Sequence, residues 1–265
     1  MRWGRRHEDC LEARRRGAGV AMTNLGNFWG VGVGPGPRGL LPVAALEALA
    51  KAAVIYLPRA RSADSSIARQ CLAGLEIPEA TLREIEFTMD PDREVLREHY
   101  SSLAADIAAE LEAGRDVAYL TLGDPMTYST YGYTLAALAE RLPAAVIRTF
   151  PGITSFATAA AALQWPLGEG KERVLILPCP DEGPALRRDI ETHDVVVLMK
   201  IGKRLPMVLQ VLRDMGISEH CALAARIGLP GETLCDDLTR LPEAESLGYL
   251  STMLIRRAAR KRRHL

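Results

Sequence analysis

The sequence has no uninterrupted apolar run of about 18 residues, the length at which a membrane-spanning helix is expected, so we predict no membrane partner. Cysteine is scarce, with five residues in a chain of 265, and no two of them form a CxxC pair. Unpaired thiols are typical of a reducing cytoplasm, which is the expected location. The five histidines are scattered without metal-ligand spacing, and no metal site is predicted.

An excess of charge of one sign is also missing, because 33 basic and 33 acidic residues balance. The ends are basic, with six arginines and three acidic residues in 1–21 and six basic residues in 256–265. The body between them, residues 22–255, therefore holds 21 basic and 30 acidic side chains. Nucleic acid is bound mainly through basic side chains that neutralise its phosphates, and a body with this acidic excess lacks a broad basic surface. No nucleic-acid partner is therefore predicted.

Both ends are expected to lie outside the fold. Residues 1–21 lack the apolar stretch of a secretion signal, and Met22 precedes the first segment that looks folded. We expect a disordered leader or a natural start at Met22. The basic tail, residues 257–265, is expected to be solvated and disordered.

Familiar catalytic motifs are missing too. The chain contains no GxSxG, P-loop, HExxH or paired carboxylates at helical spacing. No catalytic residue or general base is assigned from the sequence. Some group transfers need neither a protein nucleophile nor a metal, because orientation in a dry pocket supplies most of the rate.

What the chain does have is a regular alternation of strand-like and helix-like segments. In the first half we expect strands at 28–34, 53–57, 81–87, 116–122 and 144–150. The helices between and after them are expected at 40–52, 64–71, 92–113, 129–141 and 154–163, with Asp64 capping the second and Pro58 ending the second strand. This βαβ order predicts an α/β fold with a mainly parallel sheet.

The second half differs from the first. Residues 164–171 combine proline, glycine and charge, and we expect the boundary between domains 22–165 and 166–256 there. Strands are expected at 173–177, 194–199, 220–225, 231–238 and 249–256, with helices at 184–191 and 203–215. Only a short irregular stretch separates the last two strands, which predicts a smaller, mixed sheet.

Three Gly/Pro-rich corners follow apolar runs: Gly32–Gly36, Leu122–Pro125 and Phe150–Ser155. An open α/β sheet binds its ligand in the crevice beyond the carboxyl ends of its strands. We therefore expect the three corners to share one pocket for a small molecule. The first corner formally fits GxGxxG, but Pro35 and Pro37 remove two backbone N–H donors that a phosphate cradle needs. It is either a tight structural turn or a backbone-lined pocket floor.

The second and third corners carry polar side chains. Asp124 either binds a ligand amine or ribose or only fixes its turn. Four hydroxyl residues follow in a row, and Ser129 or Thr130 is expected to cap the next helix. In the third corner, Thr154 and Ser155 start an Ala-rich helix, where capping is again the alternative to ligand binding.

These motifs together resemble one enzyme family. GVGVGPG, AAVIYLPRA, LGDPMTYSTYGY, FPGITSF and VVVLMK occur in order and are similar to motifs of the tetrapyrrole methylases of cobalamin biosynthesis, above all the precorrin-2 C20-methyltransferase branch. The resemblance runs from about Asn27 to about Arg256. It implies two α/β domains of the tetrapyrrole methylase type, a homodimer, and S-adenosylmethionine in a cleft between the domains.

The resemblance also implies site residues. The loop at Pro35 would form the floor of the cofactor site, and Met199 and Gly228 would surround the adenine. The other implied cofactor contacts are Leu122, Gly123, Asp124, Thr127, Thr154 and Ser155, and the run of hydroxyls after the second corner adds Ser129 and Thr130 as candidates. The substrate would be a reduced tetrapyrrole bearing several carboxylates, which cationic side chains bind well. The candidates are Arg38, Arg59, Arg61 and Lys200, each with an ordinary solvated or ion-paired surface role as its alternative.

Several functions stay open at this stage. The first is methyl transfer from S-adenosylmethionine to C20 of precorrin-2, giving precorrin-3A. The same reaction on cobalt-precorrin-2, or a sibling methylase acting at another ring carbon, is the near alternative. Some siblings carry an aspartate where Pro58 aligns, so proton removal by that route is in doubt. A nicotinamide-dependent reductase and a non-catalytic binding protein are more distant alternatives.

Overall fold

The computed structural model describes residues 25–36, 39–60, 65–88, 90, 92–241, 245–248 and 250–259. The leader, residues 1–21, two candidate cations, Arg38 and Arg61, the expected cap Asp64, and positions 260–265 of the basic tail lie outside the described residues. Contacts divide the chain into two compact units, of which unit 1 is Met1–Gly34 with Arg38–Ile153, and unit 2 is Pro35–Pro37 with Thr154–Leu265.

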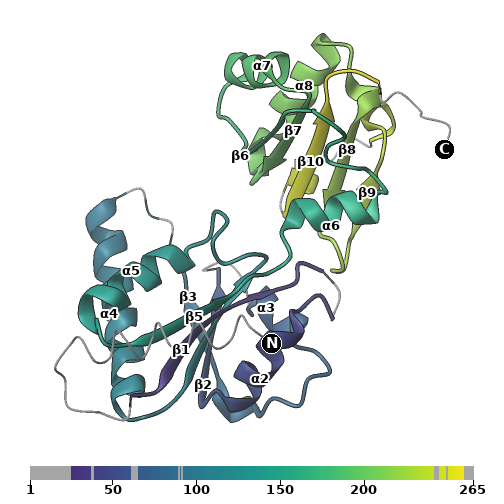
Figure 1. The fold of residues 1–265 in the computed structure, drawn as a ribbon. Helices are drawn as coiled ribbons and strands as arrows, with labels where there is room; N and C mark the ends of the chain where they lie inside the picture. Colours follow the sequence, from purple (N-terminus) through teal and green to yellow (C-terminus); the bar gives the residue numbers. More distant parts are fainter. Residues whose placement is uncertain are drawn as a thin grey trace. The chain divides into compact units, whose positions relative to one another are not determined.

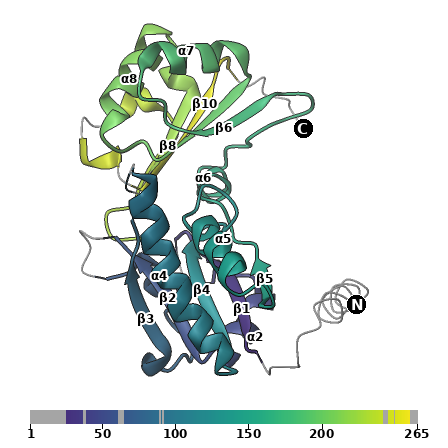
Figure 2. The same cartoon turned by 90° about the vertical axis from the view of Figure 1, so that its left-hand side faces the viewer.

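Unit 1 contains a five-stranded sheet in the order β3-β2-β4-β1-β5 (Figure 2). All four neighbouring pairs are parallel, as the βαβ pattern predicts. The strands are β1 Asn27–Val33, β2 Val54–Arg59, β3 Leu82–Glu86, β4 Val117–Leu122 and β5 Val146–Phe150. β1, β2 and β4 are almost fully buried, because helices cover both faces of the sheet.

Two helical layers cover the unit 1 sheet. One face packs against α2 (Val43–Lys51) and α3 (Ile67–Cys71), and the other against α4 (Arg93–Glu112) and α5 (Tyr131–Arg141). The 3-10 turn η1, Glu79–Thr81, precedes β3. The N-cap residue of α4 is Asp92, whose side chain accepts a hydrogen bond from the Glu94 N–H, as expected of a capping aspartate.

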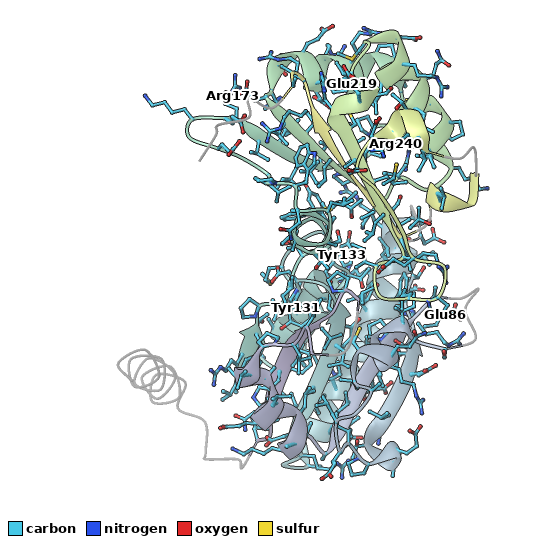
Figure 3. The ribbon with its side chains drawn as sticks, turned by 90° about the vertical axis from the view of Figure 1, so that its right-hand side faces the viewer. Glu86, Tyr131, Tyr133, Arg173, Glu219 and Arg240 are labelled. Atoms are coloured by element: carbon cyan, nitrogen blue, oxygen red, sulfur yellow. The ribbon has the colours of Figure 1, made fainter. Side chains whose placement is uncertain are left out.

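Tyr131 and Tyr133 both lie on α5 (Figure 3), but only Tyr131 is fully buried. Its ring occupies the space that a side chain on Gly30 of β1 would need, and its hydroxyl lies 2.8 Å from Thr149 Oγ1 on β5. Tyr131 therefore fastens the start of α5 to the carboxyl half of the sheet.

Two local predictions in unit 1 are wrong. Pro58 does not end β2, which continues to Arg59. The ladder between β2 and β4 covers only Val54–Tyr56, so β2 has β3 as its one neighbour at position 58, where a missing N–H is tolerated. The N-cap residue of α3 is Ser66, not Asp64, and its hydroxyl donates to the Pro58 carbonyl at 2.6 Å.

Unit 2 contains a mixed five-stranded sheet in the order β6-β7-β10-β8-β9 (Figure 1). β6 and β7 are parallel, whereas β10 runs antiparallel to β7 and β8, and β9 antiparallel to β8. The predicted mixed sheet is therefore confirmed. The strands are β6 Val174–Pro178, β7 Val195–Met199, β8 Cys221–Ala225, β9 Thr233–Cys235 and β10 Ser251–Arg256.

The helices of unit 2 cover both faces of its sheet. α7 (Gly183–Thr192) and α8 (Leu205–Asp214) pack on one face, and α6 (Ser155–Ala162) packs on the other. The described part of unit 2 also contains the 3-10 turns η2 Gly202–Arg204, η3 Ser218–His220, η4 Leu238–Arg240 and η5 Glu245–Gly248. α6 groups with unit 2, whereas the sequence placed it before the expected boundary at 164–171, because it packs on β10.

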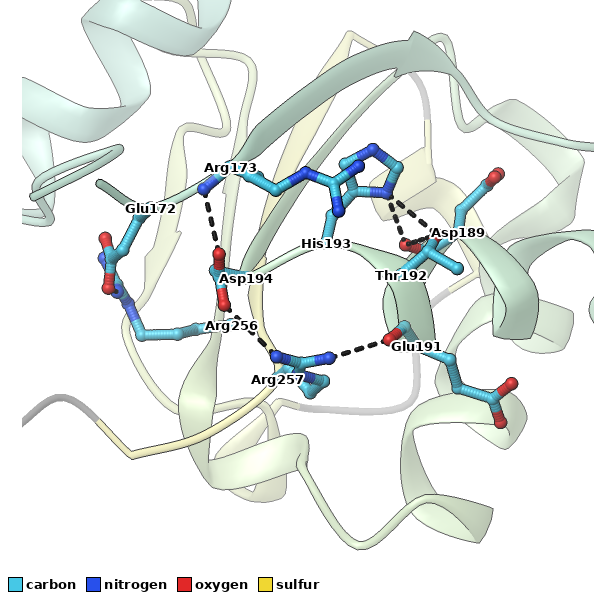
Figure 4. A network of polar contacts seen from close by, with 9 residues as sticks. All are labelled: Glu172, Arg173, Asp189, Glu191, Thr192, His193, Asp194, Arg256 and Arg257. Carbon is cyan, nitrogen blue, oxygen red and sulfur yellow. Dashed lines mark hydrogen bonds and ion pairs between the residues drawn. The ribbon is translucent and has the colours of Figure 1, made fainter.

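A polar network holds the edge of this sheet where β7 begins and β10 ends (Figure 4). Asp194 accepts a hydrogen bond from the Arg173 N–H at 2.9 Å and forms an ion pair with Arg257 at 3.1 Å. The nearly buried Arg256 pairs with Glu172 and lies over the Trp165 ring. Asp194 and Glu172 are thus each paired with an arginine. The candidate site residues of unit 2 lie at the opposite ends of these strands, where β7 ends and β10 begins.

Candidate functional site

The three glycine corners meet at one edge of the unit 1 sheet. They follow β4, β1 and β5, which are neighbours in the sheet and run parallel, so their carboxyl ends share one edge. A Cβ atom on Gly32 would lie 2.5 Å from Gly123 O and 2.6 Å from Gly152 N. Only glycine permits this approach. The backbone of each corner is therefore fixed by the other two, and the crevice expected beyond these strands has a rigid base.

Asp124 ties two of the corners together. Its Oδ1 atom accepts hydrogen bonds from Met126 N at 3.0 Å and from Thr127 Oγ1 at 2.9 Å, while Oδ2 accepts one from Gly152 N at 3.0 Å. The turn-fixing alternative for Asp124 is thus part of its role. A carboxylate oxygen has two lone pairs, so Oδ2 retains acceptor capacity for a ligand donor.

The hydroxyl residues after Asp124 have different local roles. Ser129 Oγ accepts a hydrogen bond from Tyr131 N at 3.0 Å and lies 3.4 Å from Thr121 Oγ1. The N-cap residue of α5 is Thr130, but its side chain makes no capping bond. Ser129 therefore satisfies the first turn of α5. Tyr128, which directly precedes Ser129, has φ +51°. This backbone conformation is strained for a residue with a bulky side chain.

The Pro35 loop continues the first corner into unit 2. Gly36, the next residue, has φ +103°, and a Cβ atom there would lie 3.2 Å from Ile227 O. Ile227 follows β8 and precedes Gly228. Pro35 and Gly228, both expected near the cofactor, therefore come from segments that pack together within unit 2.

A second pair of candidates meets at β10. Ser155, the first residue of α6, accepts a hydrogen bond from Thr252 Oγ1 at 3.0 Å. Thr252 pairs with Met199 across the sheet. Ser155 and Met199 thus share one neighbour, which lies at the edge where β7 ends and β10 begins. Thr154 caps α6 by accepting a bond from Ala157 N at 3.4 Å, which is the alternative role expected for it.

Of the four candidate cations, two lie among the described residues. Arg59, at the end of β2, forms an ion pair with Glu84 Oε2 at 3.5 Å, and both side chains are partly exposed. Glu84 also accepts a hydrogen bond from Ser66 N at 3.0 Å. Lys200 directly follows β7 with φ +53°. The residue is exposed as a whole, yet desolvation lowers the pKa of its ammonium.

Three buried thiols are poor nucleophiles. Burial raises the pKa of Cys71 and of Cys179 to about 11, and that of Cys221 to about 12. A thiol that stays protonated near neutral pH does not supply the thiolate that covalent catalysis needs. Among the described residues no three His, Cys, Asp or Glu side chains are grouped as metal ligands, and no described helix has the length and apolarity to cross a membrane.

Two contacts at these edges were not predicted from the sequence. Thr252 lies in a strand whose pattern reports only burial, and its bond to Ser155 joins positions 97 residues apart. Glu84 looks like any exposed residue of an alternating strand, yet it holds both Arg59 and Ser66. No local signal in the sequence marks either contact.

Comparison with known proteins places this arrangement in context. Residues 27–242 match the family described as tetrapyrrole (corrin/porphyrin) methylases. A cobalt-precorrin-2 C(20)-methyltransferase of Salmonella typhimurium is 28% identical over 87% of this chain and 96% of its own. A probable cobalt-precorrin-2 C(20)-methyltransferase of Methanocaldococcus jannaschii is 34% identical over 70% of this chain and 76% of its own. A precorrin-2 C(20)-methyltransferase of a Sinorhizobium species is 32% identical over 78% and 86%.

Solved structures share the fold. A cobalt precorrin-4 methyltransferase superposes with a TM-score of 0.67 at 18% identity, covering 90% of this chain and 98% of that one. A uroporphyrin-III C-methyltransferase of Thermus thermophilus, solved in complex with S-adenosyl homocysteine, superposes with a TM-score of 0.55 at 19% identity, covering 87% and 97%. At these identities the likeness concerns the α/β architecture of parallel and mixed sheets.

Proposed function

Because the chain belongs to the tetrapyrrole (corrin/porphyrin) methylase family, we propose that it transfers a methyl group from S-adenosylmethionine to C20 of precorrin-2, giving precorrin-3A. The observation that carries this proposal is the likeness to relatives named for C20 methylation, at 28–34% identity over 70–87% of the chain. The reaction belongs to cobalamin biosynthesis.

The donor makes modest chemical demands on the protein. Bound S-adenosylmethionine supplies a methyl group that its sulfonium already makes electrophilic. The protein then has to orient the two reactants and exclude water, which needs no protein nucleophile. The rigid glycine corners and the weakly acidic buried thiols of this chain suit that division of work.

We propose two sets of cofactor contacts. In unit 1 they are Leu122, Gly123, Asp124, Thr127, Ser129 and Thr130, and in unit 2 they are Pro35, Thr154, Ser155, Met199 and Gly228. The unit 1 set fits a ligand with an ammonium and hydroxyl donors, because Asp124 Oδ2 retains acceptor capacity beside the Gly152 bond. Pro35 offers no N–H, which disfavours a phosphate-bearing dinucleotide at the same corner.

We propose that Arg59 and Lys200 bind carboxylates of the tetrapyrrole. Arg38 and Arg61 remain proposed for the same role on the strength of their sequence positions. The ion pair between Arg59 and Glu84 is partly exposed, so a substrate carboxylate competes with Glu84 at small cost. No general base for the C20 proton is assigned.

The proposed reaction leaves open whether the substrate is metal-free precorrin-2 or its cobalt complex. The relatives include enzymes named for cobalt-precorrin-2 and one named for precorrin-2. The deciding experiment incubates the protein with methyl-labelled S-adenosylmethionine and precorrin-2, with and without cobalt, and locates the label by NMR. Label at C20 in either arm supports the proposal and fixes the preferred form. Label at another ring carbon, or no transfer in both arms, overturns it.

Ligand binding separates this proposal from a nicotinamide-dependent reductase. S-adenosylhomocysteine should raise the melting temperature by mass action, whereas NAD(P) should leave it unchanged. The reverse result would favour the reductase. A protein that binds the tetrapyrrole without forming any methylated product would be a non-catalytic binder.

We also propose that the chain works as a homodimer in the cytoplasm. Unpaired cysteines support the location, and the family resemblance supports the assembly. Light scattering coupled to size-exclusion chromatography tests the second point, since a particle mass near 28.9 kDa would mean a monomer.

A further inference from the structure

Three neighbouring strands of unit 2 each carry one non-glycine residue in the left-handed region at the same edge. Lys200 follows β7 with φ +53°, Arg226 follows β8 with φ +54°, and Leu250 precedes β10 with φ +51°. β10 lies between β7 and β8 and runs antiparallel to both, so these positions form one row. Left-handed backbone is costly for such side chains and clusters at functional sites.

Arg226 is oriented but not neutralised. Its Nε–H donates to the Pro230 carbonyl at 2.7 Å, which fixes the plane of the guanidinium within the loop between β8 and β9. Among the described residues no carboxylate forms an ion pair with it, whereas Arg204 and Arg240 nearby in the sequence pair with Asp181 and Asp237. The outer nitrogens of Arg226 therefore present a fork of donors suited to a carboxylate.

The loop that holds Arg226 is closed on itself. Gly228 N donates to Glu232 Oε2 at 2.5 Å, so the acid nearest along this loop is already engaged with backbone. Arg226 N donates to the Leu250 carbonyl at 3.0 Å, which fixes the arginine backbone to the start of β10. The side chain thus leaves a rigid backbone, and little conformational entropy remains to be lost when an anion binds.

Lys200 supplies a second cation on the same edge. Its carbonyl accepts a hydrogen bond from Arg204 Nη1 at 2.9 Å, which braces the strained turn. No described carboxylate forms an ion pair with the Lys200 ammonium. Two strand spacings of about 4.8 Å separate β7 from β8, so the Lys200 and Arg226 backbones lie roughly 10 Å apart and can serve different carboxylates of one ligand.

We propose that Arg226 binds a peripheral carboxylate of the tetrapyrrole and acts with Lys200 to recognise the substrate by its charge. The inference rests on the proposed function and adds a residue that the sequence did not single out. Arg226 holds the substrate and takes no part in proton or methyl transfer. Its loss should therefore affect the KM for the tetrapyrrole and leave the affinity for S-adenosylhomocysteine unchanged.

The decisive variant is Arg226→Gly, because it removes the guanidinium and also relieves the left-handed backbone. The KM for the tetrapyrrole should rise about tenfold to hundredfold, the effect of losing one charge-assisted hydrogen-bonded contact. The melting temperature should be unchanged or higher. A purely structural arginine would give the opposite pattern, with lower stability and an unchanged KM, and that result would overturn the proposal.

Two further variants complete the test. Gln164→Gly is the matched control, since Gln164 has φ +50° and is exposed and uncharged, so its KM should equal that of the wild type. Arg226→Lys keeps the charge and should restore part of the affinity, with the salt dependence of KM retained. If Arg226→Gly raises the dissociation constant of S-adenosylhomocysteine as strongly as the tetrapyrrole KM, the assignment to substrate fails.

The proposed function and this inference fail separately. If the wild-type protein transfers no methyl group to either form of precorrin-2, the proposed function is wrong. If the wild-type protein methylates C20 and Arg226→Gly has the same KM for the tetrapyrrole, only the role of Arg226 is wrong.

Discussion

The carboxylate of Asp124 accepts a hydrogen bond from the backbone N–H of Gly152 at 3.0 Å. Asp124 follows β4 and Gly152 follows β5, and β1 lies between these strands in the sheet. The bond therefore spans the end of β1, where Gly32 leaves no room for a side chain. One side chain thus joins the corners after β4 and β5 across the end of β1.

Asp124→Ala should lower stability as well as cofactor affinity. It removes the acceptor for Met126 N, Thr127 Oγ1 and Gly152 N. We expect a loss of about 1–3 kcal/mol, because partly exposed donors regain water when their acceptor is lost. Urea unfolding measures the first effect and titration with S-adenosylhomocysteine the second.

Thr127→Val is the matched control, since it deletes one donor and keeps the carboxylate. It should cost less than Asp124→Ala and leave the bond to Gly152 in place. Should Asp124→Ala unfold at the same urea concentration as the wild type, the aspartate does not brace the corners.

Gly32→Ala should be among the most damaging small substitutions in the chain. A Cβ atom there would lie 2.5 Å from Gly123 O and 2.6 Å from Gly152 N, and both neighbours are backbone. We expect a loss of about 3 kcal/mol or more, or failure to fold. Circular dichroism with thermal unfolding measures it.

Gly132→Ala provides the contrast at another glycine. Gly132 lies in the first turn of α5, and outside that turn no atom of the described residues lies within 4 Å of an added Cβ. Alanine there should stabilise by up to about 1 kcal/mol through helix propensity. Equal effects at both glycines would mean that the backbone approach at Gly32 is looser than described.

The alternation of elements could be predicted from the sequence, because burial imposes it. Burial in a packed α/β fold imposes continuous apolar runs on strands such as β7, whose five residues are all buried, and an amphipathic period on helices such as α4. The three corners could be located for the same reason. Each begins where an apolar run stops, and parallel pairing then brings neighbouring strand ends together.

The polar contacts at the strand ends could not be predicted. Asp124 and Gly152 are 28 residues apart, and Ser155 and Thr252 are 97 apart. Such pairs depend on sheet order, which local periodicity does not encode. Pro58 could not be placed for the same reason. A strand can continue through a proline where no neighbouring strand needs its N–H, and for Pro58 this depends on where the ladder between β2 and β4 stops.

Arg59 and Glu84 should respond to substitution with opposite signs. Arg59→Ala removes a proposed carboxylate contact and should raise the KM for the tetrapyrrole about tenfold. Glu84→Gln removes the competing charge at 3.5 Å while an amide oxygen can still accept from Ser66 N. The KM of Glu84→Gln for the tetrapyrrole should stay equal or fall, with a stability loss of less than about 1 kcal/mol.

Steady-state kinetics at low ionic strength measures the KM of both variants. If the KM rises in Glu84→Gln as it does in Arg59→Ala, Glu84 orients Arg59 instead of competing for it.

Glu110 should make the protein sensitive to acid. It is nearly buried on α4, and hydrogen bonds from Arg115 and then Arg83 hold its pKa below the ordinary value of 4.5, against the opposing effect of burial. Because the folded-state pKa is the lower one, Glu110 contributes its full stability above the ordinary pKa. That contribution is lost as the pH falls through the folded-state pKa.

Glu110→Gln should therefore destabilise the protein by about 1–2 kcal/mol near pH 7. The difference from the wild type should shrink steadily below about pH 4.5, because the Glu110 carboxyl of the unfolded wild type begins to bind a proton there, whereas the glutamine of the variant does not titrate. Urea midpoints measured from about pH 7 to about pH 3 give the curve. Glu112→Gln, which changes an exposed neighbour on the same helix, should show only a small difference from the wild type near pH 7. A Glu110→Gln difference that stays constant across this range would mean that the two arginines do not hold the carboxylate in its charged form.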